Sequence, residues 1–458
     1  MSSKSRAISQ QAFESLVTEN IEDLGMDPDE ALEDAVQTLT LQGVDLSGII
    51  KCIPGVNGVG DHPIMQPLDK LREISKAINE TINLEELIEL LNKLYDLSTE
   101  APENASIAIR NGGVELVISI CSNIRSEKPL ISALKALSSI IPDVQSTETF
   151  RQSDGPKIVM DILNNHHQNI DILDGGLSVI AAAATCNEVL KEQFVDLKVD
   201  ELFLQIMGEH SKDTPQSLYD AIRVLLTPDD NRVVASQVFG YARRFAKLGI
   251  ANALIGALQG GQRSSSSLIS ACIALKAVAV NDEICRSISE NGGIDAIFQF
   301  IDGSGEYNNK AVARACCSLL SKLAGSDDNK TAIVQKGGLD RLIKLSSRFS
   351  DDPSVLQEVM STIGILSLRS PENAARAVEA GAGDLAIQSM QKLPAAYQMQ
   401  RQSCLMIRNL VARNPENRTI LLNNGIEKLI RKAKGSHQSC KDAATAALRD
   451  LGLDDYNA

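Results

Sequence analysis

A glycine that recurs at a nearly fixed interval constrains the fold of this 458-residue chain more than any other feature. Successive copies are 42, 94, 44, 45, 45 and 42 residues apart. They are Gly113, Gly155, Gly249, Gly293, Gly338, Gly383 and Gly425. The one double interval predicts a further copy, whose glycine is replaced near Lys198. Such a period indicates a solenoid of small units, because each unit needs a neighbour to bury its apolar faces.

The last complete unit, residues 414–452, shows what one period contains. Asn414 is expected to cap a first helix that has Pro415 at its first position, and Gly425 is expected to end it. A second helix follows, and the pair Gly435-Ser436 predicts a break before a third helix at residues 438–451. Four units share an Asn placed 8 to 10 residues before the glycine. These are Asn104, Asn329, Asn373 and Asn417.

Three helices in 42 to 45 residues is the period of armadillo repeats, with the two-helix HEAT unit as the nearest alternative. We therefore predict an all-α fold, an armadillo-repeat right-handed superhelical solenoid. It is expected to fill residues 68–452 with a leading half-repeat and about eight repeats. A Gly- and Pro-rich linker at residues 53–67 precedes it, and a short tail at residues 453–458 follows. Hydrophobic residues make up 43% of the chain but aromatics only 3%, which fits an aliphatic helical core.

Residues 1–52 form a separate acidic helical module at the N-terminus. Residues 1–50 carry ten Asp or Glu and two basic residues, a net charge of −8 out of −14 for the whole chain. Phe13 and Val17 belong to one apolar helical stripe, and a second helix is expected to start at Asp27-Pro28 and to end before Gly43. Residues 44–52 are expected to form a third, short helix.

Three roles remain open for this module. It can cap the exposed face of the first repeat, or it can be a tethered recognition element for a basic partner. The pattern around Leu24-Gly25-Met26 and Ala35-Val36 also resembles a ubiquitin-binding three-helix module.

Nine scattered cysteines without paired spacing indicate a reduced protein inside the cell. No apolar run approaches the length of a membrane span, and the N-terminus lacks the apolar region of a signal peptide. We expect a soluble protein of the cytosol, the nucleus or both.

About nine extra residues enter the array between the third helices near Val224 and Ala277, since this interval is 53 residues and the others are 40 to 45. The insertion falls at residues 231–247, a segment that combines aromatic residues with Arg243 and Arg244. It can bind an acidic peptide, a phosphate or the chain's own N-terminus. The alternative is an elongated first helix with a solvated basic face.

Four stretches resemble the armadillo repeat-containing protein 6 family. They are GVDLSGIIK at 43–51, DDNRV at 229–233, CLMIRNLVA at 404–412 and AALRDLG at 446–452. With matching length and order, the resemblance covers essentially the whole chain. It implies the superhelical fold and a role in protein interaction, and it implies no catalytic activity.

Armadillo proteins that carry nuclear-import cargo share an Asn on each third helix and a Trp one turn earlier, which together clamp an extended basic peptide. Here only Asn409 fills the Asn position, and the chain has no Trp. Basic residues occur instead one position earlier, as Arg223 and Arg408 do, while Arg401 lies one heptad before Arg408 and Lys322 fills a position itself. Spaced cations along a groove suit acidic or phosphorylated chains. The alternative is a set of solvated edge charges, which contribute little.

We find no catalytic, metal or cofactor motif, and the chain is predicted not to be an enzyme. An isoelectric point near 5.0 argues against nucleic acid, and no membrane contact is expected. We predict a scaffold or adaptor that binds a protein or peptide segment, acidic or phosphorylated, and that can also contact its own N-terminal module. The alternative is a ubiquitin-linked or nuclear-transport-type adaptor in which the N-terminal module reads the partner. The candidate binding residues are Arg223, Arg243, Arg244, Lys322, Arg401, Arg408 and Asn409.

Overall fold

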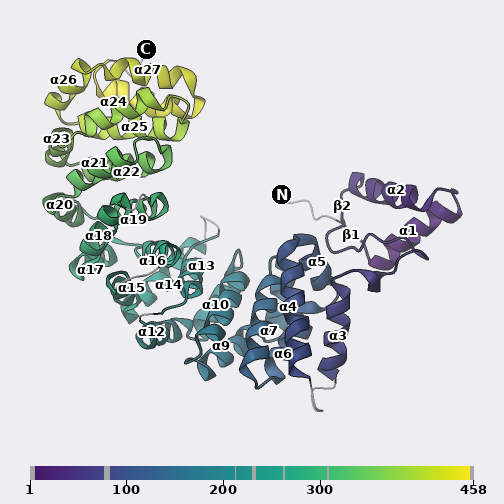
Figure 1. Cartoon of the computed structure of the whole chain (residues 1–458). Coiled ribbons are helices and arrows are strands. Elements are labelled where there is room, and N and C mark those ends of the chain that lie inside the picture. Colours follow the sequence, from purple (N-terminus) through teal and green to yellow (C-terminus); the bar gives the residue numbers. More distant parts are fainter. Residues whose placement is uncertain are drawn as a thin grey trace. The chain divides into compact units, whose positions relative to one another are not determined.

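The computed structural model describes residues 6–76, 83–211, 213–229, 234–260, 264–306 and 309–453. In these ranges the chain is built from α-helices, apart from one parallel ladder of two residues a strand, β1 (Arg6–Ala7) beside β2 (Val44–Asp45), and two short 3-10 turns (Figure 1). The predicted all-α class is confirmed. The start of the insertion, residues 231–233, and most of the predicted tail, residues 454–458, lie outside the described residues.

The N-terminal module contains two helices, α1 (Gln10–Glu22) and α2 (Pro28–Leu41). Asp27 caps α2 through a bond from the Asp29 N–H, with Pro28 at the first helical position as expected. The two helices enclose their own apolar cluster. Its buried members are Phe13, Val17, Ala31, Ala35, Leu39 and Ile49.

The third helix predicted at residues 44–52 is wrong. Gly43 and Gly48 adopt φ values of +71° and +75°, and the Asp45 carboxylate accepts a bond from the Ser47 N–H, which closes a turn instead of a helix. A Cβ on Gly48 would come within 2.6 Å of the Ser106 carbonyl oxygen, so this segment packs closely against the repeat array. The module is therefore a helix pair with a packed turn, and not a three-helix domain.

A 3-10 turn (Val59–Asp61) leads into the helix pair α3 (Met65–Lys76) and α4 (Leu84–Glu100), and eight helix triplets follow. The first helices are α5 (Pro102–Arg110), α8 (Val144–Gln152), α11 (Glu188–Asp196), α14 (Val234–Leu248), α17 (Asp282–Glu290), α20 (Asp327–Gln335), α23 (Pro371–Glu379) and α26 (Pro415–Asn423). The second helices are α6 (Gly113–Asn123), α9 (Gly155–Asn165), α12 (Val199–Glu209), α15 (Ile250–Gln259), α18 (Gly293–Glu306), α21 (Gly338–Arg348), α24 (Ala382–Lys392) and α27 (Ile426–Ser436). The third helices are α7 (Glu127–Ser139), α10 (Ile170–Ala184), α13 (Gln216–Leu225), α16 (Ser265–Val278), α19 (Lys310–Leu323), α22 (Pro353–Ser367), α25 (Tyr397–Val411) and α28 (Lys441–Asp450).

The break between first and second helices requires a left-handed residue, and in most repeats it lies just before the recurring glycine. Gly112 and Gly337 take this conformation, whereas Gly113 and Gly338 begin the next helix. A Cβ on Gly338 would lie 2.7 Å from the Ile333 carbonyl oxygen, so the recurring glycine here serves close packing. Lys198 has φ +64°, which confirms the predicted replacement of a glycine near this position.

The break in the last repeat falls at His437 and not at Gly435-Ser436, which still belong to α27. The His437 ring nitrogen Nε2 lies 2.7 Å from the Pro394 carbonyl oxygen, and this contact anchors the turned residue. A 3-10 turn (Gln438–Cys440) then precedes α28. A glycine permits a break but does not force one.

The recurring Asn near the start of first helices joins neighbouring elements. The buried Asn417 amide donates to the carbonyls of Leu410 and Ala374, and the buried Asn329 amide donates to those of Leu323 and Cys285. Each amide thus satisfies a carbonyl at the end of the third helix before it and one in the previous first helix.

The extra residues near 231–247 lengthen a first helix. α14 has 15 residues, whereas the other seven first helices have nine each. Phe245 is fully buried and meets Phe203 edge to face at 6.2 Å. The elongated-helix alternative therefore describes the residues from 234 onward.

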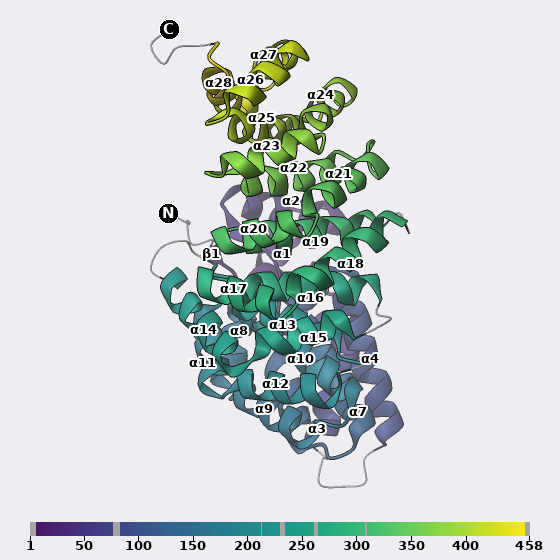
Figure 2. The same cartoon turned by 90° about the vertical axis from the view of Figure 1, so that its left-hand side faces the viewer.

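The chain divides into two compact units. The first unit comprises Met1–Leu202 and Pro228–Val234, and the second comprises Phe203–Thr227 and Ala235–Ala458. Within each unit the third helices pack against one another in succession, and α4 of the leading pair takes the place of a third helix: α4, α7 and α10 in the first unit, and α13, α16, α19, α22, α25 and α28 in the second. Figure 2 shows the first helices α17 and α20 on one side of the second unit and the second helices α18 and α21 on the other.

Candidate protein-interaction surface

The third helices of the second unit are strongly basic, although the whole chain carries −14. These six helices hold nine basic and four acidic residues, a formal charge of +5. We call the basic set the cationic ridge. It consists of Arg223, Lys276, Lys310, Arg314, Lys322, Arg401, Arg408, Lys441 and Arg449.

Most of the cationic ridge is available to a ligand. Eight of its nine residues are exposed, and Arg449 is half-buried. Lys310 pairs with Asp352, and Arg408 and Arg449 both contact Asp450, at 3.3 and 2.7 Å. Six members form no ion pair with any described residue. These six are Arg223, Lys276, Arg314, Lys322, Arg401 and Lys441, and of them Lys276 donates a hydrogen bond to the Ser318 hydroxyl at 2.6 Å.

On α25 the ridge runs through Arg401, Leu405 and Arg408, which recur at intervals of four and three residues and share one helix face. Asn409 does not lie on this exposed face. It is half-buried, and its amide donates to the Gly364 carbonyl of α22 at 2.9 Å, where the two helices approach closely. On α25 the exposed position is therefore that of Arg408, and the Asn position is turned towards α22. Asn409 joins two helices and does not present a free amide.

The other predicted residues fall into two groups. Arg223 on α13 and Lys322 on α19 are exposed third-helix residues, as Arg401 and Arg408 are. Arg243 and Arg244 lie on the first helix α14, so they do not share the line of third helices. Arg243 is exposed and donates from Nε to the Phe239 carbonyl of its own helix, and Arg244 is half-buried.

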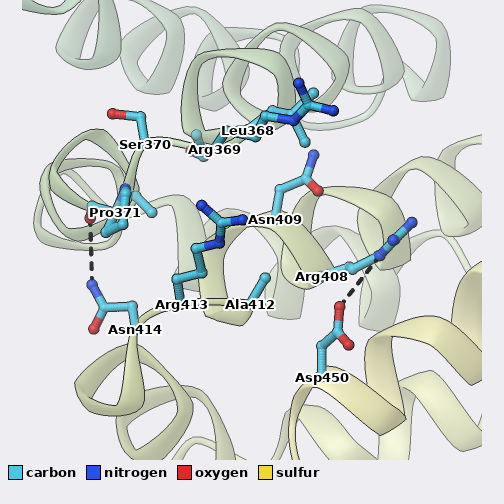
Figure 3. A pocket seen from close by; sticks show the side chains of 12 residues that line it. Leu368, Arg369, Ser370, Pro371, Arg408, Asn409, Ala412, Arg413, Asn414 and Asp450 are labelled. Atoms are coloured by element: carbon cyan, nitrogen blue, oxygen red, sulfur yellow. Dashed lines mark hydrogen bonds and ion pairs between the residues drawn. The ribbon is translucent and has the colours of Figure 1, made fainter.

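A pocket of about 140 Å³ opens where α22 and α25 end (Figure 3). We call it the arginine pocket. It is lined by Ser367, Leu368, Arg369, Ser370, Pro371, Ala374, Arg408, Asn409, Ala412, Arg413, Asn414 and Asp450. Arg408 and Asn409 connect it to the ridge, and Arg369 and Arg413 enter it from the two turns that follow those helices.

Sequence reasoning missed Arg369 and Arg413, although a signal was present. The segments Arg-Ser-Pro-Glu-Asn at 369–373 and Arg-Asn-Pro-Glu-Asn at 413–417 repeat at an interval of 44 residues. In each, the arginine directly precedes the residue that caps the next first helix, Ser370 or Asn414. Equivalent turn positions in successive repeats bring both arginines to one pocket.

Among the described residues, no group of three or more His, Cys, Asp or Glu could hold a metal ion. Eight of the nine cysteines are buried, and burial raises the pKa of the Cys121 and Cys404 thiols to about 12. No single described helix is both long and apolar enough to span a membrane, and the bent pair α5 and α6 passes that test only jointly, with a 77° bend.

Comparisons with known proteins agree with this fold. The ARMC6 family model matches residues 64–455, and the armadillo repeat-containing protein 6 N-terminal domain matches residues 5–83. Armadillo repeat-containing protein 6 of Homo sapiens is 28% identical over 388 residues, which are 81% of this chain and 75% of that protein. The Drosophila melanogaster homolog is 25% identical over 381 residues, 82% of this chain and 80% of its own length.

Two solved structures share the fold at low identity. An engineered protein has a TM-score of 0.55 and 16% identity, over 83% of this chain and 98% of its own. A chain from the structure titled "A conserved phosphorylation switch controls the interaction between cadherin and beta-catenin in vitro and in vivo" has a TM-score of 0.56 and 15% identity, over 85% of this chain and 79% of its own.

Stacked helix triplets of this period define an armadillo-repeat protein, a class of protein-interaction scaffolds. The two family models place it more narrowly, because together they match nearly the whole sequence. The chain belongs to the armadillo repeat-containing protein 6 family.

Proposed function

We propose that this protein is a non-enzymatic scaffold whose cationic ridge binds an acidic segment of a partner protein. The observation that carries the proposal is the charge of +5 on the third helices of the second unit, in a chain whose net charge is −14. Structural ion pairs do not account for it, because six of the nine cations have no ionic partner among the described residues. A field of one sign along successive helices favours an oppositely charged chain.

Aliphatic side chains on the same helix faces give the surface a second kind of contact. Ile273, 38% exposed, lies one turn before Lys276, and Leu405 lies between Arg401 and Arg408. Leu368, 42% exposed, borders the arginine pocket. Charge alone yields little affinity at a solvated surface, so these side chains favour a segment that alternates acidic and apolar residues.

The N-terminal module contacts a different part of the chain. Arg110 at the end of α5 donates from its guanidinium to the Ile8 carbonyl at 3.1 Å, and Gly48 packs on Ser106 of the same helix. The Gln10 side chain bridges α1 to the Ile50 N–H and carbonyl, which fixes the turn that touches α5. We propose that the module caps the first repeat. We also propose that the protein resides in the cytosol or the nucleus, because its nine scattered cysteines lack paired spacing.

The test compares three full-length proteins by affinity capture from a cell lysate: the natural sequence, R401E/R408E and the control K93E/K135E. Lys93 and Lys135 are exposed lysines on third helices of the first unit. Circular dichroism must first show equal helicity. Acidic proteins captured by the natural sequence and the control, and lost from R401E/R408E, support the proposal. The same set of proteins from all three would contradict it.

The alternative function makes the N-terminal module the recognition element, in a ubiquitin-linked or nuclear-transport-type adaptor. Its two exposed leucines, Leu24 at 65% and Leu41 at 81%, are the observation in its favour. Deleting residues 1–52 from the full chain separates the possible roles. If the module is a cap, the truncated protein loses amide protection in α5 and keeps its partners. If the module reads the partner, the truncated protein no longer binds that partner. If the module is autoinhibitory, the truncated protein binds more tightly through the cationic ridge.

A further inference from the structure

We propose that the arginine pocket is a phosphoryl-binding subsite, which receives a phosphorylated side chain of the segment bound along the cationic ridge. The inference rests on the proposed function and adds to it the chemistry of one position of the ligand. The geometry points to this pocket because three arginine residues from two successive repeats are among those that line it: Arg369, Arg408 and Arg413.

The charge of the pocket matches a phosphoryl group. Its lining holds three arginines and one acidic residue, Asp450, a formal charge of +2. A phosphorylated side chain carries about −1.5 to −2 at neutral pH and offers three strong acceptor oxygens. A carboxylate carries one negative charge and would leave the pocket incompletely neutralised. Planar guanidinium forks are the side chains best suited to such oxygens.

Two of the three arginines are not committed to structure. Arg413 is exposed and forms no hydrogen bond or ion pair with a described residue. Arg369 is exposed and forms no ion pair there either. A hydrogen bond from Lys330 is the main cause that lowers the pKa of the Asp327 carboxyl, and the charge of Arg369 makes a smaller contribution. Arg408 is held at 3.3 Å by Asp450, which Arg449 also contacts at 2.7 Å. A phosphoryl group can therefore draw Arg408 away and leave Asp450 neutralised by Arg449.

The walls of the pocket are fixed before any ligand arrives. The Asn414 side chain caps α26 and reaches the Pro371 carbonyl, which ties the two arginine-bearing turns together. Lys330 donates to the Leu368 carbonyl at 3.2 Å on the other side. Arg369 adopts φ +58°, a left-handed conformation in which the backbone cannot continue α22. Figure 3 shows the Arg413 side chain reaching from its own turn towards the turn that holds Ser370 and Pro371. Preorganised donors lower the entropic cost of binding.

The experiment uses the full chain and three fluorescein-labelled pools of short peptides. Each pool has degenerate flanks of Asp, Glu and Leu, and the central residue is Ser, phosphoserine or Glu. Fluorescence anisotropy gives an apparent Kd for the natural sequence, for R369Q/R413Q and for R401Q. The last variant removes a ridge cation outside the pocket. The single variant R413Q covers the case in which the double variant does not fold.

We expect the natural sequence to bind the phosphoserine pool roughly tenfold or more tightly than the Ser pool, with the Glu pool between them. In R369Q/R413Q that preference should fall below about threefold. R401Q should weaken all three pools about equally and keep the preference. This pattern supports a phosphoryl subsite in the pocket.

Other results overturn the inference. If the natural sequence binds the Ser and phosphoserine pools equally, the pocket is not a phosphoryl-binding subsite. The proposed function still holds in that case if R401Q weakens the binding of both pools. Failure of every pool to bind contradicts the proposed function as well. Displacement of the phosphoserine pool by oligo-deoxythymidine at the same phosphate concentration would show a general polyanion surface and would overturn the assignment to a phosphopeptide.

Discussion

The two compact units share one architecture and differ in the charge of their third helices. In the first unit α4, α7 and α10 carry eight acidic and three basic residues, a formal charge of −5. The six third helices of the second unit carry +5. In both units the faces that pack between repeats are aliphatic. The fold therefore requires aliphatic residues on the buried face of each helix, whereas the charge of the exposed face can differ between the two units.

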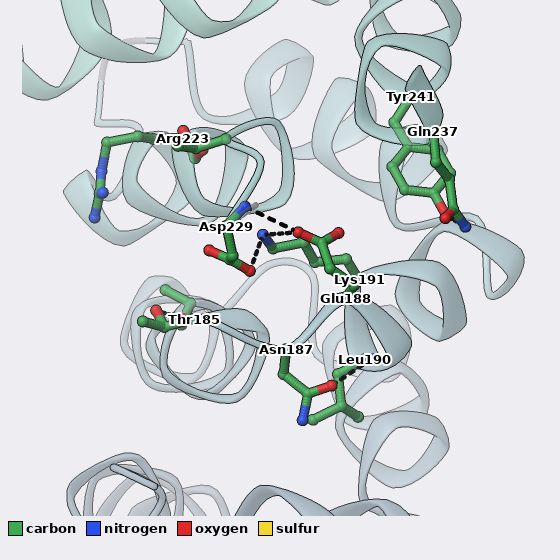
Figure 4. A network of polar contacts seen from close by, with 11 residues as sticks. Thr185, Asn187, Glu188, Leu190, Lys191, Arg223, Asp229, Gln237 and Tyr241 are labelled. Atoms are coloured by element: carbon green, nitrogen blue, oxygen red, sulfur yellow. Dashed lines mark hydrogen bonds and ion pairs between the residues drawn. The ribbon is translucent and has the colours of Figure 1, made fainter. Parts of the chain in front are cut away.

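The units also differ in how they use an interior lysine. Lys191 and Lys330 are both the fourth residue of a first helix, and each contacts the acidic first residue of that helix. Lys330 continues to a carbonyl oxygen, that of Leu368. Lys191 is fully buried and continues to the carboxylate of Asp229 at 2.6 Å, in the segment Pro228–Val234 of its own unit (Figure 4). Each lysine thus forms one ion pair within its own helix, and its second partner is a carbonyl in one unit and a carboxylate in the other.

The largest expected effect follows from that second difference. Lys191→Ala leaves the carboxylates of Glu188 and Asp229 facing each other without a cation and should destabilise the first unit by about 2–3 kcal/mol, because both are still partly solvated. Lys330→Ala should cost about 1 kcal/mol, since water can reach the Leu368 carbonyl. Hydrogen–deuterium exchange measures the two losses of stability, in α10–α11 for Lys191→Ala and in α20–α22 for Lys330→Ala. Lys198→Ala, which replaces an exposed lysine, is the control. Equal losses of protection would break the comparison.

The next prediction tests whether charge on third helices decides binding. Arg314→Glu with Lys322→Glu on α19 should weaken an acidic peptide about tenfold. The matched reversal in the first unit, Asp171→Lys with Asp174→Lys on α10, should change the affinity less than about twofold. Fluorescence anisotropy at low and physiological salt measures both, and the natural affinity should fall as salt rises because the contacts are exposed. A larger effect from the α10 variant would place the binding surface in the first unit.

A smaller effect, of opposite sign, is expected from Asp450→Asn. The substitution removes the acidic partner of Arg408 and Arg449 but keeps the shape of the side chain. The affinity for an acidic peptide should rise about threefold, because one exposed ion pair no longer competes with the ligand. The Lys441→Asn variant removes a ridge cation on the same helix and should act in the opposite direction. Unchanged affinity in Asp450→Asn would exclude Arg408 from the contact.

Much of this organisation was readable from the sequence, because breakers and caps are local signals. The repeat period, the cap at Asn414 and the glycine replaced at Lys198 all follow from residues within one turn of the feature they control. The prediction at residues 44–52 was wrong because packing on α5 and two left-handed glycines decide that segment. The arginine pocket needed the structure, since it joins two turns 44 residues apart whose proximity depends on how consecutive repeats stack.

A further small effect is expected at the helix break that both units share. Lys198 in the first unit and Gly249 in the second both adopt positive φ, at +64° and +101°. A Cβ at Gly249 would meet no atom within 4 Å, so Gly249→Ala tests backbone strain alone and should cost about 1 kcal/mol. Lys198→Gly should stabilise by about 0.5 kcal/mol, because relief of strain exceeds the entropy that glycine loses on folding. Lys198→Ala corrects for loss of the exposed ion pair to Glu201. Thermal unfolding of the three variants measures these differences. A stability gain from Gly249→Ala would mean that the break tolerates side chains generally, and Lys198 would then be an ordinary substitution without strain.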